Sequence, residues 1–263
     1  MSSGFDRVHL LAPPGVEIDA RRCAEALQPW SSKHLTNLAI DVRTGGGWLV
    51  RELNVEHLDA VRAALIGAGV EPLVVPSDGG PIGTPDVRQV RTVEGEITHL
   101  QLTTRDGAEE LALDTVACAL LLVEGEVIDS NLPTLVEAIA PLLATARGPI
   151  ARQRDALGPA KFSLQAASLC VVLREPVDIL DFTPATRFLN YRARGAASAL
   201  DAWLHFQHDL VAALGAGKCS PALAEFWRDG SIEGNILNDR VERQNRLSWL
   251  AELVARDWWK GAS

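Results

Sequence analysis

The sequence has few lysines and no apolar run of the length that a membrane span requires. Lysine occurs at only four of the 263 positions, so arginine supplies 21 of the 25 basic residues. This bias, with abundant alanine and a single methionine, is typical of a GC-rich bacterial genome, and isolated arginines therefore carry little functional weight. The longest apolar run, residues 115–123, is far shorter than the roughly 20 residues that cross a bilayer, so we expect no membrane insertion.

The cysteines are few and far apart. Cys23, Cys118, Cys170 and Cys219 form no Cys-x-x-Cys pair, whereas zinc sites usually contain closely spaced ligands. We therefore expect reduced thiols that pack in the core. One alternative is a reactive Cys219, because the following helix N-terminus at Ser220 would lower its pKa.

Charge and composition narrow the class of protein. The formal net charge of −9 lacks the basic footprint of a nucleic-acid-binding surface, so no nucleic-acid partner is expected. The 47% hydrophobic content indicates a globular chain, and the length allows two domains. The first residues have neither the basic nor the apolar region of a secretory signal, which predicts a cytoplasmic protein.

Catalytic motifs are missing as well. We find no Gly-x-Ser-x-Gly or Ser-x-x-Lys pattern, and the glycines at 45–47 lead into an expected strand rather than a helix. A tight turn explains these glycines better than a nucleotide site. We expect no cofactor and assign no catalytic residue, and whether the chain is an enzyme stays open.

Residues 6–77 form the first expected domain, a small α/β unit. Its strands are expected at 7–11, 48–53 and 71–76. A first helix is expected from Asp19, its N-cap, to Leu27. Ser31–Ser32 cap a second helix that ends near Ile40. Asn54 caps a third helix, whose apolar face comprises Leu58, Val61, Leu65 and Ile66.

The resulting order, β-α-α-β-α-β, resembles the C-terminal domain of ribosomal protein L7/L12 and the ClpS-like adaptor fold. The closest part is residues 55–75, with the ending Ala-Leu-x-x-Ala-Gly-Val-Glu-Pro at residues 64–72. The resemblance covers about a quarter of the chain and rests on element order. It implies a small domain that docks other proteins through an exposed helix surface.

A glycine- and proline-rich linker is expected at 78–86, followed by a β-rich domain at 87–217. Strands are expected at 87–93 and 96–103, joined by Glu94–Gly95, and at 109–113 after an Asp-Gly turn. Residues 115–123 and 168–173 are expected to be buried strands, with a buried helix at 132–146 and a polar connector at 148–159 between them. Residues 177–191 are expected to be extended, with a bend marked by Pro184. This meander resembles the half-barrel of a PH-like domain.

Helices are expected towards the C-terminus. A strong amphipathic helix spans 196–214, and residues 218–263 form a helical extension with helices at 220–230 and 240–260. Asp239 and Glu242 have the spacing of a capping box at the start of the last helix. The overall prediction is an α+β protein with a small βααβαβ domain, then a β-rich domain with terminal helices.

One pair of histidines has the spacing of metal ligands. His205 and His208, beside Asp209, lie three positions apart, which places them on one face of a helix. A third ligand would have to come from elsewhere in the chain. The alternative is that both are polar residues at the edge of the apolar face around Trp203.

Two other features point to a partner surface. Arg187, Arg192 and Arg194 form the one local basic cluster, which could dock an anionic ligand or an acidic segment, or face solvent beside the chain's own carboxylates. The last helix is rich in tryptophan, which is enriched in interaction hot spots. The alternative is that this helix folds back onto the second domain and buries its tryptophans. Its candidate contact residues are Trp249, Leu253, Trp258 and Trp259.

The leading hypothesis is therefore a non-enzymatic protein–protein interaction protein, an adaptor or assembly subunit of a cytoplasmic bacterial complex, with a protein partner or self-association. The alternative is a metal- or small-ligand-dependent enzyme or binding domain that uses His205 and His208.

Overall fold

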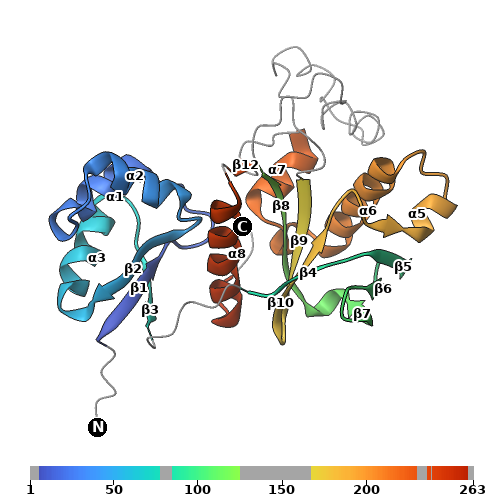
Figure 1. Ribbon diagram of the computed structural model, residues 1–263, viewed down its shortest axis with the longest axis horizontal. Helices are drawn as coiled ribbons and strands as arrows, with labels where there is room; N and C mark the ends of the chain where they lie inside the picture. Colours follow the sequence, from blue (N-terminus) through green and yellow to red (C-terminus); the bar gives the residue numbers. More distant parts are fainter. Residues whose placement is uncertain (1–5, 78–84, 125–166, 230–235, 238, 260–263) are drawn as a thin grey trace, which may run out of the picture. The chain divides into compact units, whose positions relative to one another are not determined.

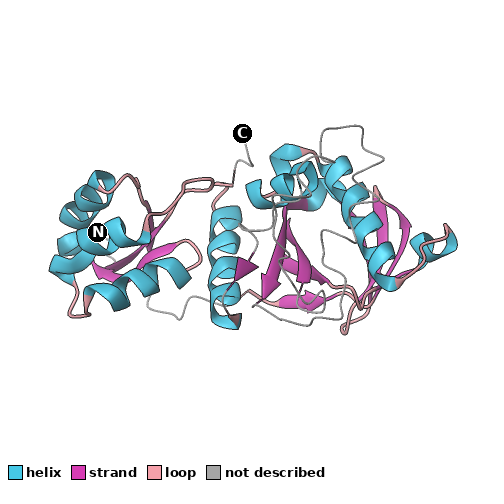
Figure 2. Cartoon of the chain, turned by 90° about the horizontal axis from the view of Figure 1, so that it is seen from above, coloured by secondary structure: helices cyan, strands magenta, loops and turns pink. Residues whose placement is uncertain are grey.

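The computed structural model describes residues 6–77, 85–124, 167–229, 236–237 and 239–259. The chain is α+β, and both of its compact units combine helices with strands (Figures 1 and 2). One unit contains Met1–Pro85 with Arg240–Leu253, and the other contains Asp86–Asp239 with Val254–Ser263. The expected extension at 218–263 is thus divided between the two units.

The first unit has the βααβαβ order that the sequence predicts. Its three-stranded sheet has the order β2-β1-β3, and both pairings are antiparallel. The elements are β1 (Arg7–Leu11), α1 (Ala20–Leu27), α2 (Leu35–Thr44), β2 (Trp48–Asn54), α3 (Leu58–Gly67) and β3 (Leu73–Pro76).

Side-chain caps explain where α1 and α2 begin. Asn54, predicted to cap the third helix, instead caps the 3₁₀ turn Val55–His57, and α3 begins without a side-chain cap. Asp19 accepts the backbone N–H groups of Arg21 and Arg22 at 3.1 and 3.0 Å, as expected for the cap of α1. The prediction that Ser31–Ser32 cap α2 is wrong. Ser31 Oγ instead accepts the N–H of Lys33, and His34 caps α2, so this helix begins at Leu35 and runs on to Thr44.

Helices cover both faces of this sheet. One face packs against α1, α2 and α3, and the other packs against α8 (Arg240–Ala255), whose residues up to Leu253 belong to this unit (Figure 1). On the first face Val61 and Leu65 of α3 are fully buried, whereas Ile66, which the sequence placed with them, is 49% exposed. Ile66 is one residue, or about 100°, further round the helix than Leu65.

The second unit contains two sheets. The five-stranded sheet has the order β12-β8-β9-β10-β4, and the four-stranded sheet has the order β11-β5-β6-β7. The strands are β4 (Val87–Gln89), β5 (Thr92–Glu96), β6 (His99–Thr103), β7 (Ala108–Ala112), β8 (Val116–Glu124), β9 (Ala167–Arg174), β10 (Val177–Phe182), β11 (Arg187–Phe188) and β12 (Ile236–Leu237). Residues 116–123 are all buried, which confirms the prediction for the central apolar run.

The expected strand at 87–93 is in fact two strands in different sheets. The N–H of Val90 donates to the Asp181 carbonyl, whereas the next N–H, that of Arg91, donates to the Thr103 carbonyl. The chain therefore crosses from β4 in one sheet to β5 in the other. The turn predicted at Glu94–Gly95 is also wrong, because Gly95 lies within β5, opposite Leu100, and β5 and β6 meet at Glu96 and His99.

Residues 177–191 bend near Pro184 as predicted, but the segment after the bend is not extended as far as Tyr191. After β10 the chain bends, and the Thr186 hydroxyl donates to the Val90 carbonyl at 2.9 Å, which fixes the bend beside β4. The short strand β11 then leads directly into α5 (Leu189–Ala193), so Tyr191 is helical.

Helices α6 (Ala199–Leu214) and α7 (Pro221–Asp229) complete the second unit. The side chain of Ser198 caps α6, and the helix contributes Trp203 and Phe206 to the core that both sheets enclose. Trp203 is fully buried, and its indole N–H donates to the Phe182 carbonyl at 3.1 Å.

Three predictions fall wholly or mainly outside the described residues: the linker at 78–86, the buried helix at 132–146 and the polar connector at 148–159. Within the described residues, no helix is both long enough and apolar enough to span a membrane.

Candidate binding surface

Most of the C-terminal residues proposed for partner contact are buried in the chain itself. Trp249 and Trp259 are each 7% exposed, and Leu253 is fully buried. Trp258 is half-buried, and the Arg256 guanidinium lies 5.6 Å from its ring centroid. This burial favours packing within the chain over partner contact. Contrary to the prediction, however, residues 240–253 of the last helix pack in the first unit and not on the second domain.

Helix α8 docks through specific polar contacts as well as apolar ones. The Trp249 indole N–H donates to the Ala12 carbonyl at 2.9 Å, and the Trp48 indole N–H donates to the Asn245 carbonyl at 3.2 Å. The Asn245 side chain also bonds Thr44 and Arg51. These contacts join sequence positions that are about 200 residues apart.

The turn at 45–47 is the surface on which α8 rests. A Cβ atom on Gly46 would lie only 2.8 Å from the Cα of Arg246, and one on Gly47 would lie 2.5 Å from the Trp249 ring. Both glycines also have positive φ angles, 62° and 113°. The two glycines therefore allow α8 to pack closely against this turn. The sequence predicts the turn but not the helix that packs on it.

The basic cluster around α5 lies on the surface. Arg187, Arg192 and Arg194 are exposed, while Phe188 and Tyr191 pack inward, as the alternation of arginines and aromatics indicates. The Tyr191 hydroxyl donates to Asp209 Oδ2 at 2.9 Å, and burial together with this bond raises the pKa of Tyr191 well above its usual value. The tyrosine thus holds α5 against α6.

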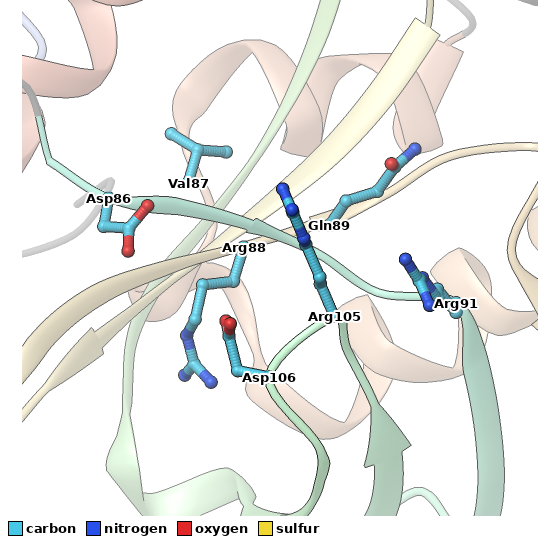
Figure 3. A pocket seen from close by; sticks show the side chains of 7 residues that line it. All are labelled: Asp86, Val87, Arg88, Gln89, Arg91, Arg105 and Asp106. Atoms are coloured by element: carbon cyan, nitrogen blue, oxygen red, sulfur yellow. The ribbon is translucent and has the colours of Figure 1, made fainter.

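A second group of arginines lines a recess that the sequence does not indicate. The recess has a volume of about 740 Å³ and lies between β4 and the turn that joins β6 to β7 (Figure 3). Its lining residues are Asp86, Val87, Arg88, Gln89, Arg91, Arg105 and Asp106.

Arg88 forms the wall of the recess and already has its counter-charges. Its Nη1 donates to Glu109 Oε1 at 2.6 Å, and its Nη2 pairs with Asp178 Oδ2. Burial disfavours the charged guanidinium, but the bonds to Glu109 and Asp178 outweigh it and raise the pKa of Arg88. This side chain ties three strands together and is not available to a ligand as a simple counter-charge.

Arg91 and Arg105 differ from Arg88 in their partners. Both are exposed, and within the described residues neither side chain forms an ion pair or hydrogen bond. In Figure 3 the Arg105 side chain extends alongside β4 towards Gln89, and Arg91 lies at the same end of the recess. The two lining carboxylates lie elsewhere, Asp86 at the opposite end and Asp106 beside Arg88. Positive charge is therefore concentrated at one end.

The recess and the cluster around α5 are neighbours in the structure. The N–H of Arg187 donates to the Arg91 carbonyl at 2.9 Å, where β11 pairs with β5. We name these exposed arginines together the arginine surface. It consists of Arg91, Arg105, Arg187, Arg192 and Arg194.

The histidine pair lies on the exposed side of α6. His205 Nε2 is 3.4 Å from Asp201 Oδ1, and His208 Nδ1 is 3.4 Å from Asp209 Oδ1. Within the described part of the chain, no three His, Cys, Asp or Glu side chains have the arrangement of a metal site. The third ligand that the metal hypothesis requires is therefore missing from that part.

All four cysteines are free and buried. Burial raises the pKa of the Cys219 thiol to about 11, so the prediction of a lowered pKa at this position is wrong. The reason is that Cys219 lies against β8, bridged to Ala119, rather than in an exposed loop.

A polar network in the first unit also escaped sequence reasoning. Glu52 has a φ of 58°, at a bulge between β1 and β2, and its N–H donates to the buried His9 Nδ1 at 3.1 Å. The Ser77 hydroxyl donates to Glu52 Oε1 at 2.7 Å. Because the serine bonds the carboxylate, this order differs from that of a nucleophile–histidine–acid triad.

Comparison with known proteins gives no relative. No protein-family model, no curated protein and no solved structure matches this chain. The resemblance of residues 6–77 to the L7/L12 C-terminal and ClpS-like domains, and that of the meander to PH-like domains, therefore stay predictions.

Proposed function

We propose that this protein is a non-enzymatic adaptor that binds an acidic segment of a partner protein through the arginine surface. The observation that carries the proposal is the pair Arg91 and Arg105. Both are exposed at one end of a recess, and neither side chain forms an ion pair with a described residue, in a chain whose net charge is −9.

Physical chemistry favours an acidic partner over other ligands. Guanidinium groups match carboxylates in a planar, two-bonded geometry, and they keep their charge at any physiological pH. The arginine surface has few basic groups compared with a surface that binds a nucleic-acid backbone. The net negative charge of the chain would also repel a long run of phosphates. An acidic protein segment needs only a local positive surface.

The first unit supports the adaptor proposal in a second way. Its element order is the one on which the resemblance to L7/L12 and ClpS-like domains rests, and such domains dock proteins.

The test is a titration of the full chain with a fluorescent peptide of eight glutamates, next to one of eight lysines, at 50 and 300 mM NaCl. We expect the glutamate peptide alone to bind, and its affinity to fall with salt. Combining Arg91→Glu with Arg105→Glu should weaken binding at least tenfold without lowering the melting temperature.

The matched control changes two exposed arginines of the first unit, Arg22→Glu with Arg43→Glu, which alters the net charge by the same amount. We expect this control to bind within about twofold of the unmodified chain. Equal losses in the two double variants would show that only net charge matters, and would contradict a defined binding surface.

A further inference from the structure

Strand β4 lies at the edge of the five-stranded sheet, beside the arginine surface. It pairs with β10 on one side, in the register Ile179 to Val87, Leu180 to Arg88 and Asp181 to Gln89. On its other side, no strand among the described residues pairs with it. Such an edge exposes backbone groups that can accept another strand.

The hydrogen bonds of β4 show which of its backbone N–H and C=O groups have no strand partner among the described residues. The N–H of Val90 donates to the Asp181 carbonyl, so Val90 and, two residues earlier, Arg88 direct their backbone groups towards β10. Alternate residues of a strand direct these groups to opposite sides, so those of Val87 and Gln89 point away from β10. Both residues line the recess.

Charge distinguishes the β4 edge from the β7 edge of the four-stranded sheet. The β4 edge ends at Arg91 and has Arg105 alongside it (Figure 3). The edge strand of the four-stranded sheet, β7, instead contains Glu109 and Glu110. An acidic segment would be attracted to the first edge and repelled by the second.

From this geometry we infer that the acidic partner segment binds in extended form, as an additional strand on the free edge of β4. Its backbone bonds the N–H and C=O groups of Val87 and Gln89, and its carboxylates bond Arg91 and Arg105. The inference rests on the proposed function and adds the conformation of the ligand and the atoms that recognise it. It predicts that the ligand has acidic residues at alternate positions, because alternate side chains share one face of a strand.

Backbone N-methylation tests this mode without altering the protein. The probe is a fluorescent nine-residue peptide of alternating glutamate and threonine, with capped ends. Two isomers are compared, one N-methylated at three successive threonines and one at three successive glutamates. Only one set of N–H groups can face β4, so we expect one isomer to bind at least tenfold more weakly than the other.

The outcomes separate the inference from the proposed function. If both isomers bind with equal affinity, weakly or tightly, strand addition is overturned, while charge-dependent binding of the unmethylated peptide would still support the arginine surface. If the unmethylated peptide itself does not bind, the proposed function fails first. If instead the chain forms a concentration-dependent dimer that the peptide disrupts, the edge pairs with a second copy, and the inference of an acidic segment is overturned.

Discussion

The face of α8 and the arginine surface are both rich in residue types that are common at interfaces, yet the structure buries the first and exposes the second. The one tryptophan of the helix, Trp249, is buried against the chain's own sheet and glycine turn, whereas the five arginines are exposed and their side chains form no ion pair with a described residue. Tryptophan has so much apolar surface that intramolecular packing competes strongly for it. Exposed arginine can instead pair with a carboxylate of the chain, as Arg62 does with Glu71, so the arginines without such a partner are the better guide to a binding surface.

The strongest way to break this comparison is to remove the anchor of α8. Trp249→Ala deletes a buried aromatic side chain and its bond to Ala12, and we expect a loss of about 3–5 kcal/mol in the free energy of unfolding of the first unit. Urea unfolding measures the loss. The control is Val241→Ala on the same helix, where the side chain is 60% exposed and the effect should stay below about 0.5 kcal/mol.

The glycine turn at 45–47 provides a second test of how closely α8 packs on the first unit. Gly46→Ala places a methyl group against the backbone of Arg246 and should cost about 2–3 kcal/mol. Gly15→Ala is the matched control, because Gly15 also has a positive φ but no atom within 4 Å of the added Cβ. The difference in melting temperature between the two variants isolates helix docking from backbone strain, and equal melting temperatures would contradict close packing by α8.

Cys219 gives a smaller effect that depends on pH. Its pKa is about 11 in the folded chain and lower in the unfolded chain, so the unfolded state loses the proton first as pH rises. Its contribution to stability is therefore complete below about pH 8 and falls as pH rises towards 11, by about 1 kcal/mol at pH 10. Unfolding of the natural chain and of Cys219→Ala at pH 8 and pH 10 should show this extra loss only in the natural chain.

The smallest effect is expected at the histidine pair. His205 and His208 are about half-exposed and lie 3.4 Å from single carboxylates, so replacing either by alanine should change stability by less than about 0.5 kcal/mol. Melting curves with zinc and with a chelator provide the check. A zinc-dependent rise in melting temperature that both substitutions abolish would restore the metal hypothesis.

Local patterns predicted much of the fold. The apolar run at 116–123, the Asp19 cap and the βααβαβ order all depend on neighbours in the sequence, and each is confirmed. Some errors are local, such as the Ser31–Ser32 cap, and others lie where distant segments decide. The break between β4 and β5 depends on Asp181 and Thr103, which bond successive N–H groups of the strand that was expected to continue.

The binding surface was only partly predictable. The exposure of Arg187, Arg192 and Arg194 follows from their alternation with inward-facing aromatics. No spacing in the sequence could bring Arg105 to β4, or surround Arg88 with Glu109 and Asp178, because those contacts join three strands and a turn. The docking of α8 likewise depends on contacts about 200 residues apart.

The most direct test of the central claim is a charge exchange at the arginine surface. The chain with Arg91→Glu and Arg105→Glu is titrated with the glutamate peptide and with the lysine peptide, and the Trp249→Ala chain is titrated with both under conditions where it is folded. The account predicts that the charge-reversed chain no longer binds the glutamate peptide and instead binds the lysine peptide. The Trp249→Ala chain should behave with both peptides as the natural chain does. Loss of glutamate-peptide binding in the Trp249→Ala chain alone would contradict it and return the contact to the terminal helix.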